Sequence, residues 1–386
     1  MAFLANDAIR RVNLHSGIHA LAQNGGFVFF VVYLVRSGVP VPMALGAMAV
    51  ILAVRFMMRP AILPLARAWG IKPLLLLGTV AMAAQFPLLA EVRGTGAALA
   101  RLCFVTALGE IFYWPTYNAY FAAIGDAEHR GHQMGVREAL VSVAGILAPL
   151  LGGWALVALG PRPMFAAVAA IQVLAAIPLI GAPNVAVTDK APGAFRAARL
   201  GVILSASDGW FDACFIFVWQ IALFLSLGES FSAYGGAMAL AGLAAAALGL
   251  TLGPRIDRGQ ARSTVAIAYA SLASIVLLRA ASIGSPAPAV IANALGALLG
   301  PLLMPQSAAI YNLAKASPCP MRFLIATEGG WDVGCASACL IAAALTASGV
   351  PLSLVSLVAL PPLAVAAGLL RRYYAEGTDR PPLITL

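Results

Sequence analysis

The chain has 386 residues and a net charge of +9; only 10% of its residues are charged, while 61% are hydrophobic. Soluble domains carry about 25% charged residues, so this chain has too few polar side chains to cover a water-exposed surface. Gly and Pro show no regular period, which excludes a collagen-like protein, and five Cys in a chain of this length exclude a disulfide scaffold. A membrane protein that crosses the bilayer many times remains.

Twelve apolar runs, separated by charged residues and by Pro or Gly, predict an all-α membrane protein with 12 transmembrane helices. A helix needs about 20 residues to cross the hydrocarbon core. The runs do not alternate and are about twice as long as a barrel strand, so helices are expected rather than a barrel. Helices 1 to 12 are expected over Leu14–Val35, Pro42–Met57, Pro73–Leu89, Ala97–Ile124, Gly135–Leu159, Met164–Ala182, Leu200–Leu227, Ser232–Leu252, Ser263–Leu278, Ala287–Leu313, Phe323–Ala347 and Leu352–Leu370.

The basic residues predict which ends of the helices face the cytoplasm. With the N-terminus inside, 19 of the 24 Lys and Arg lie on the inner side and five lie outside. This asymmetry is the positive-inside pattern, so we expect a multi-pass protein of the inner (cytoplasmic) membrane with both termini cytoplasmic. The positive charge then faces anionic lipid of the inner leaflet, and no nucleic-acid partner is needed to explain it. The outer residues are Arg36, Arg93, Arg101, Arg162 and Arg279.

The longest polar connection divides the chain into two halves with six predicted helices each. We expect an N-terminal six-helix bundle over residues 1–182, a cytoplasmic linker over 183–199, a C-terminal six-helix bundle over 200–371 and a cytoplasmic tail over 372–386. Tandem halves are typical of transporters built from parallel repeats. An offset of 190 residues supports the repeat, because it aligns Pro115 with Pro305, Glu138 with Glu328 and Gly38 with Gly228.

Three segments carry motif residues at the spacing of a known family. Between helices 8 and 9, residues 253–258 read Gly-Pro-Arg-Ile-Asp-Arg and match a Gly-x-x-x-Asp-Arg loop. Between helices 2 and 3, residues 65–72 keep the basic positions of that loop, but Ala66 stands where an Asp is expected. Helix 5 has the small residues of an antiporter motif, with Ala at two of its Gly positions: Gly135, Ala144, Ala148-Pro149 and Gly152-Gly153. The chain therefore resembles the major facilitator superfamily over nearly its whole length.

This resemblance implies a fold and a mode of action. The family has two pseudo-symmetric six-helix bundles around a central cavity, and the bundles rock between inward-open and outward-open states. Helices 1, 4, 7 and 10 line the cavity, and the family usually works as a monomer. The missing Asp at Ala66 implies a first-half gate that is weaker or built differently.

Four carboxyl groups lie deep in the predicted helices: Glu110 in helix 4, Asp208 and Asp212 in helix 7, and Asp332 in helix 11. All 24 Lys and Arg fall at helix ends or in loops, so we expect no cation near these acids. Desolvation disfavours the charged form of an unpaired carboxyl group, so the four are expected to bind and release protons and to couple transport to a proton gradient. Alternatively, they pair with nearby Tyr, Ser or His and only fix helix packing.

Polar and aromatic stripes predict the walls of a substrate cavity. Aromatic rings can stack on a flat or cationic ligand, although the same rings also serve as packing residues or interface anchors. His15 and His19 are one turn apart, but two ligands do not make a metal site, so no metal and no cofactor are expected. The expected cavity residues are His19, Gln23, Tyr33, Tyr113, Tyr117, Trp210, Trp219, Asn293 and Met304.

Two acids at helix starts predict a cytoplasmic gate. Glu138 opens helix 5 and Glu328 opens helix 11, where a carboxylate is favoured by about 0.3–1 kcal/mol. By the repeat, Glu138 is expected to meet Arg255 or Arg258, and Glu328 to meet Arg59 or Arg67, with Asp257 belonging to the same gate. The alternative is that each acid only stabilises a helix start.

No phosphate-binding loop, His-Glu-x-x-His or Gly-x-Ser-x-Gly motif occurs, so we expect no enzyme and no ATP-driven pump. The leading hypothesis is a proton-coupled secondary transporter that exports a cationic or amphipathic small molecule. One alternative is a proton-driven importer of a nutrient, metallophore or metal complex. A second alternative is a membrane receptor or assembly factor that transports nothing. The expected partners are the small-molecule substrate, protons and the lipid bilayer.

Overall fold

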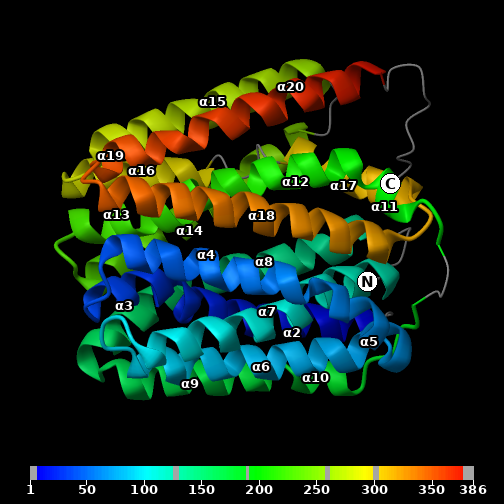
Figure 1. Cartoon of the computed structure of the whole chain (residues 1–386), viewed down its shortest axis with the longest axis horizontal. Helices are drawn as coiled ribbons and strands as arrows, with labels where there is room; N and C mark the ends of the chain where they lie inside the picture. Colours follow the sequence, from blue (N-terminus) through cyan, green and yellow to red (C-terminus); the bar gives the residue numbers. More distant parts are fainter. Residues whose placement is uncertain (1–6, 125–129, 188–190, 257–260, 299–303, 377–386) are drawn as a thin grey trace.

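The structure is a computed structural model, and it describes residues 7–124, 130–187, 191–256, 261–298 and 304–376. All secondary-structure elements in these residues are helical. Long helices lie side by side, with the first half of the chain in the lower part of Figure 1 and the second half in the upper part. Helix α2 begins and α20 ends on the same side, the right in this view, as an even number of crossings requires.

The first half contains helices α2 to α10. They are α2 (Asp7–Gly25), η1 (Phe27–Phe29), α3 (Phe30–Arg36), α4 (Val41–Met58), η2 (Arg59–Ala61), α5 (Ile62–Trp69), α6 (Ile71–Glu91), α7 (Ala97–Ile124), α8 (Arg130–Ala158), α9 (Pro161–Leu174) and α10 (Ile177–Ile180).

The connection and the second half contain helices α11 to α20. They are α11 (Ala194–Ala197), α12 (Arg199–Asp212), η3 (Ala213–Val218), α13 (Trp219–Ser226), α14 (Phe231–Ile256), α15 (Ala261–Ser282), α16 (Pro286–Leu298), α17 (Met304–Ala316), α18 (Pro320–Ala347), α19 (Leu352–Val355), η5 (Ser356–Ala359) and α20 (Leu360–Glu376).

Ten helical segments in the described residues are long and apolar enough to cross a membrane. Shorter apolar helices over Phe231–Ala246 and Pro286–Leu298 lie where helices 8 and 10 are predicted. The prediction of an all-α, multi-pass membrane protein is confirmed. The count of twelve and the division into two six-helix bundles stay predictions.

Local sequence explains several helix ends. Gly70 and Gly160 have φ angles of 84° and 83°, which side-chain-bearing residues rarely adopt, and each directly precedes a helix. Pro161 then occupies the first turn of α9, where a missing N–H costs no hydrogen bond. These residues end one span and start the next within a few positions.

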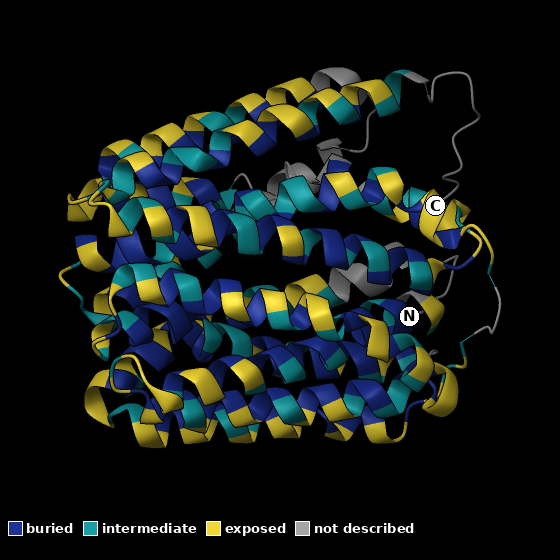
Figure 2. Ribbon diagram, viewed as in Figure 1, coloured by how far each residue is buried: buried dark blue, intermediate teal, exposed yellow. Residues whose placement is uncertain are grey.

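Apolar side chains cover the outside of the molecule. Figure 2 shows exposed residues along the outer faces of α6 and α9 at one edge and of α15 and α20 at the other. Large apolar side chains exposed by more than half include Met57, Leu151, Val157, Ile180 and Ile267. A surface of this kind suits lipid rather than water.

The most extensive contacts between the two halves are made by two helix pairs: α8 packs against α14, and α4 packs against α18. Gly235 on α14 lies so close to α8 that an added Cβ would reach 3.2 Å from the Cα of Gly153 and would clash with the Pro149 carbonyl oxygen. Small residues permit this close approach of two backbones within a membrane.

We expect Gly235→Ala to lower the thermal unfolding midpoint, because the new methyl group forces α8 and α14 apart at a cost of about 1–3 kcal/mol. Gly236→Ala is the matched control, since a Cβ at Gly236 meets no atom within 4 Å. That variant should unfold at the wild-type temperature or above it, because Ala is the better helix former. Equal midpoints for the two variants, measured by scanning fluorimetry in detergent, would contradict this interface.

Candidate functional site

Five charged side chains, four of them buried and Glu328 partly buried, connect the two halves of the chain. Arg55 Nη1 donates to Glu110 Oε2 at 2.5 Å, and Arg55 Nη2 lies 2.5 Å from Asp332 Oδ1. Arg59 Nη1 donates to Glu328 Oε2 at 3.2 Å, and Arg59 Nη2 donates to Asp332 Oδ2. The arginines come from α4 and η2, Glu110 comes from α7, and the two remaining acids come from α18. We call these five residues the interhalf network.

The interhalf network is almost dry and carries an excess of acid. The side chain of Asp332 is 0% exposed and that of Glu110 8%, and the two arginine side chains are 7% and 5% exposed. With every group charged, three carboxylates face two guanidinium groups, so the network has a net charge of −1. One additional proton would make the network neutral.

The expectation that no cation lies near the deep acids is wrong for Glu110 and Asp332. It rested on ending helix 2 at Met57, whereas the helical path continues through η2 and α5 to Trp69. Arg55 therefore lies inside the span rather than at its end. Arg55 and Arg59 are one turn apart, so both reach the acids on α7 and α18.

Glu328 is the acid that the network holds least tightly. Its ion pair with Arg59 is the longest of the four, and its side chain is 16% exposed, the most of the three acids. Asn118 Nδ2 on α7 donates to Glu328 Oε1 at 2.9 Å. The pair predicted between Glu328 and Arg59 is therefore present, while its role as a gate remains a prediction.

Asp212 does not form an ion pair within the described residues. Trp331 Nε1 donates to Asp212 Oδ2 at 3.1 Å, and the guanidinium carbon of Arg55 lies 5.4 Å from the centre of the Trp331 ring. Trp331 therefore contacts both Asp212 and the interhalf network.

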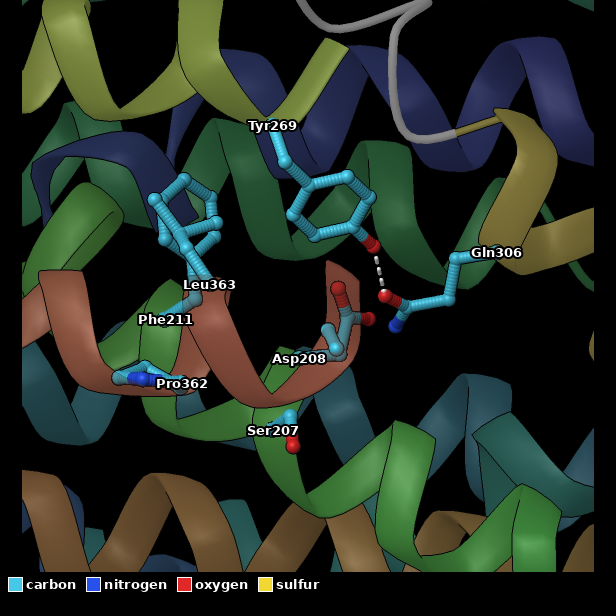
Figure 3. A pocket seen from close by; sticks show the side chains of 8 residues that line it. Ser207, Asp208, Phe211, Tyr269, Gln306, Pro362 and Leu363 are labelled. Atoms are coloured by element: carbon cyan, nitrogen blue, oxygen red, sulfur yellow. Dashed lines mark hydrogen bonds between the residues drawn. The ribbon is translucent and has the colours of Figure 1, made fainter. Parts of the chain in front are cut away.

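Asp208 lines a narrow crevice between α12, α15, α17 and α20 (Figure 3). The crevice has no room for a water-sized sphere, so it is too narrow for an organic molecule. Across it, the Tyr269 hydroxyl donates to Gln306 Oε1 at 2.5 Å, and Gln306 Nε2 donates to the Leu204 carbonyl at 3.2 Å. The described residues include no ion-pair partner for Asp208.

A cluster of His and Tyr side chains packs between α2, α7 and α9. His15 Nδ1 donates to the Ala175 carbonyl at 2.7 Å, so its Nε2 accepts from the Tyr113 hydroxyl at 3.0 Å. The rings of His19 and Tyr113 stack at 4.3 Å, and those of Tyr113 and Tyr117 stack at 5.5 Å. The structure thus brings three predicted cavity residues together, but it buries them in helix packing.

The other predicted cavity residues are distributed over both halves. Trp219 Nε1 donates to Asn293 Oδ1 at 2.9 Å, and Trp210 Nε1 donates to the Val358 carbonyl at 3.1 Å. Tyr33 is buried in α3, and its hydroxyl accepts from Arg93 Nη1 at 3.2 Å. Gln23 is half-buried on α2, and the side chain of Met304 lies outside the described residues.

The pairs expected for the remaining gate residues stay predictions. Glu138 is exposed and pairs with its neighbour Arg137 at 2.5 Å. Its predicted partner Arg258, and Asp257 beside it, lie outside the described residues. Arg67 is exposed on α5.

Sequence reasoning missed Arg55, Asn118 and Trp331. A signal for Arg55 existed, because two arginines one turn apart in an apolar segment share one helix face. Asn118 and Trp331 gave none, since their importance depends on which helices are neighbours in space.

No protein-family model matches the chain, and no curated protein matches it by sequence. Solved structures match it by shape. The crystal structure of the human organic anion transporter MFSD10 (TETRAN) matches with a TM-score of 0.69 and 16% identity, covering 94% of this chain and 99% of that chain. The POT family transporter PepTSo matches with a TM-score of 0.70 and 12% identity, covering 96% and 99%.

A POT family transporter in complex with 5-aminolevulinic acid also matches, with a TM-score of 0.65, 12% identity and 95% coverage of both chains. The chain therefore has the fold of the major facilitator superfamily, as the motif residues predict. At these sequence identities the likeness shows the fold alone.

Proposed function

We propose that the chain is a proton-coupled secondary transporter that works by alternating access and exports a cationic or amphipathic small molecule. In this proposal two six-helix bundles rock against each other in the inner membrane, with both termini cytoplasmic. The matching solved structures are transporters, and this supports the class of secondary transporter.

The interhalf network is the observation that carries the proposal. It joins the halves that must separate during alternating access, and it holds one more acid than it has arginines. A proton on one carboxyl group weakens its ion pair and frees α18 from α4 or α7. Without that proton, breaking a buried ion pair leaves a charge unpaired. The loss of one partner then lowers the free energy of unfolding by about 3–5 kcal/mol.

The balance of charge favours a cationic cargo. Arg55 and Arg59 are each held by carboxylates, so neither offers a free positive charge to an anion. Asp208 and Asp212 add two acids without ion pairs among the described residues. A cation that enters this region competes with a proton for the same carboxylates, which is the physical basis of antiport.

The test uses proteoliposomes with the pH dye pyranine and an acidic lumen. Ethidium and tetraphenylphosphonium serve as organic cations and are added outside. We expect the lumen to become more alkaline when either cation is added, because protons leave as the cation enters.

Liposomes without protein, and the same protein without a pH gradient, are the controls. Acidification of the lumen would indicate symport and overturn the antiport proposal. Cation binding without any movement of protons or cations would indicate a receptor.

A further inference from the structure

Helix 7 is interrupted by a π-turn. It consists of α12, the π-helical segment η3 (Ala213–Val218) and α13. The Trp219 N–H donates to the carbonyls of Cys214 and Ile216, whereas in a regular α-helix it would donate to Phe215. The Phe215 carbonyl has therefore lost its usual donor. Single π-turns inside α-helices occur frequently at functional sites.

Arg279 supplies the missing donor from α15. Its Nη1 donates to the Phe215 carbonyl at 2.8 Å. Its guanidinium carbon lies 3.7 Å from the centre of the Phe215 ring and 4.6 Å from that of Trp219. Both distances fall in the range of cation–π attraction, which is strongest away from water. Arg279 thus contacts the π-turn through one hydrogen bond and two rings.

The surroundings of Arg279 are built to hold it at this place. The residue is only 5% exposed, and no carboxylate in the described part of the chain forms an ion pair with it. Gly296 on α16 makes room for the guanidinium group, since a Cβ there would lie 2.8 Å from the Arg279 Cζ. A buried cation without a counter-charge is costly, so its retention here calls for a specific role.

The π-turn separates two parts of helix 7 with different tasks. On one side, α12 carries Asp208 and Asp212. On the other side, α13 packs against α3 of the first half. Close by, the Tyr234 hydroxyl of α14 donates to the Val28 carbonyl at 3.1 Å, and the rings of Tyr33 and Phe231 stack at 6.2 Å. The α13 side is therefore a second contact between the halves, apart from the interhalf network.

We propose that the π-turn η3 is the hinge on which α13 moves relative to α12, and that Arg279 is the positioning residue that holds this hinge. Release of the Phe215 carbonyl lets η3 change its helical form and moves α13 away from α3. The role of this movement in transport rests on the proposed function. The contact of Arg279 with the π-turn does not depend on transport, and its test needs no transport assay.

The experiment is hydrogen–deuterium exchange by mass spectrometry on the full chain in lipid nanodiscs. In Arg279→Met we expect amide exchange over η3 and α13 to become at least about tenfold faster. Without the hydrogen bond from Arg279 to the Phe215 carbonyl, this part of helix 7 opens locally more often. Arg279→Lys keeps a cation and a donor for Phe215, so it should restore much of the protection. Arg101→Met is the matched control, because Arg101 lies near the same membrane face but is 63% exposed.

Two results would overturn the proposal. Exchange over η3 and α13 that is the same in Arg279→Met as in Arg101→Met would show that Arg279 does not hold the hinge. Faster exchange spread evenly over α12, α15 and α20 would show that Arg279 only supports the fold. If ethidium causes no proton movement in proteoliposomes but the exchange result is as expected, the transport proposal is wrong and the hinge proposal is supported.

Discussion

Arg55→Met is expected to lower the thermal unfolding midpoint more than any other single substitution in the interhalf network. Arg55 is the sole described ion-pair partner of Glu110 and shares Asp332 with Arg59. Its loss leaves three carboxylates facing one guanidinium group in a nearly dry environment. Removing one partner of a buried ion pair costs about 3–5 kcal/mol, because the other charge stays buried and unpaired. Scanning fluorimetry in detergent measures the effect.

The double variant Arg55→Met/Glu110→Gln separates lost packing from lost charge. It removes the stranded carboxylate together with its partner, so its midpoint should return most of the way to the wild-type value. Arg101→Met again serves as the exposed control and should change stability by about 0.5 kcal/mol or less. A wild-type midpoint for Arg55→Met would show that the network does not join the halves.

Glu328→Gln is expected to remove proton coupling while leaving the protein folded. Gln has nearly the shape of Glu, and its carbonyl oxygen can still accept from Asn118. The substitution leaves two carboxylates facing two guanidinium groups, so the network is neutral without a proton. Cation movement should then continue down its own gradient but no longer drive proton movement.

Glu138→Gln is the matched control for this variant. Glu138 is a carboxylate at the corresponding position of the first half, but it is exposed and pairs only with its neighbour Arg137 among the described residues. The same chemical change there should leave coupling intact. Full coupling in Glu328→Gln, or lost coupling in Glu138→Gln, would assign the proton to another site.

Hydropathy predicted the helices well, because the bilayer imposes both their length and their composition. The offset between the halves also predicted one tertiary contact, the pair of Arg59 and Glu328. That inference succeeded because two related halves place equivalent helix starts against equivalent loops. The pair that the same offset predicts between Glu138 and Arg255 or Arg258 stays a prediction.

The interior of the candidate site could not be predicted in the same way. A charged residue near the end of an apolar run predicts the end of the helix. The Arg59-Pro60 pair favours the same prediction, because Pro disrupts a helix interior. The structure instead continues through the 3₁₀ turn η2, so Arg55 faces acids on two other helices. The environment of Trp331 likewise depends on the packing of α18 against α12 and α4, which no local pattern encodes.

The release of protons when an organic cation binds tests the central claim most directly. Purified protein in a weakly buffered solution is mixed with ethidium, and the pH change is converted to protons released per bound cation. The account predicts about one proton for the wild-type protein near the pH at which the network is protonated, and none for Glu328→Gln, because binding of cation and proton must be linked through the same acid. Binding without proton release in the wild-type protein, or equal release in both proteins, would contradict it.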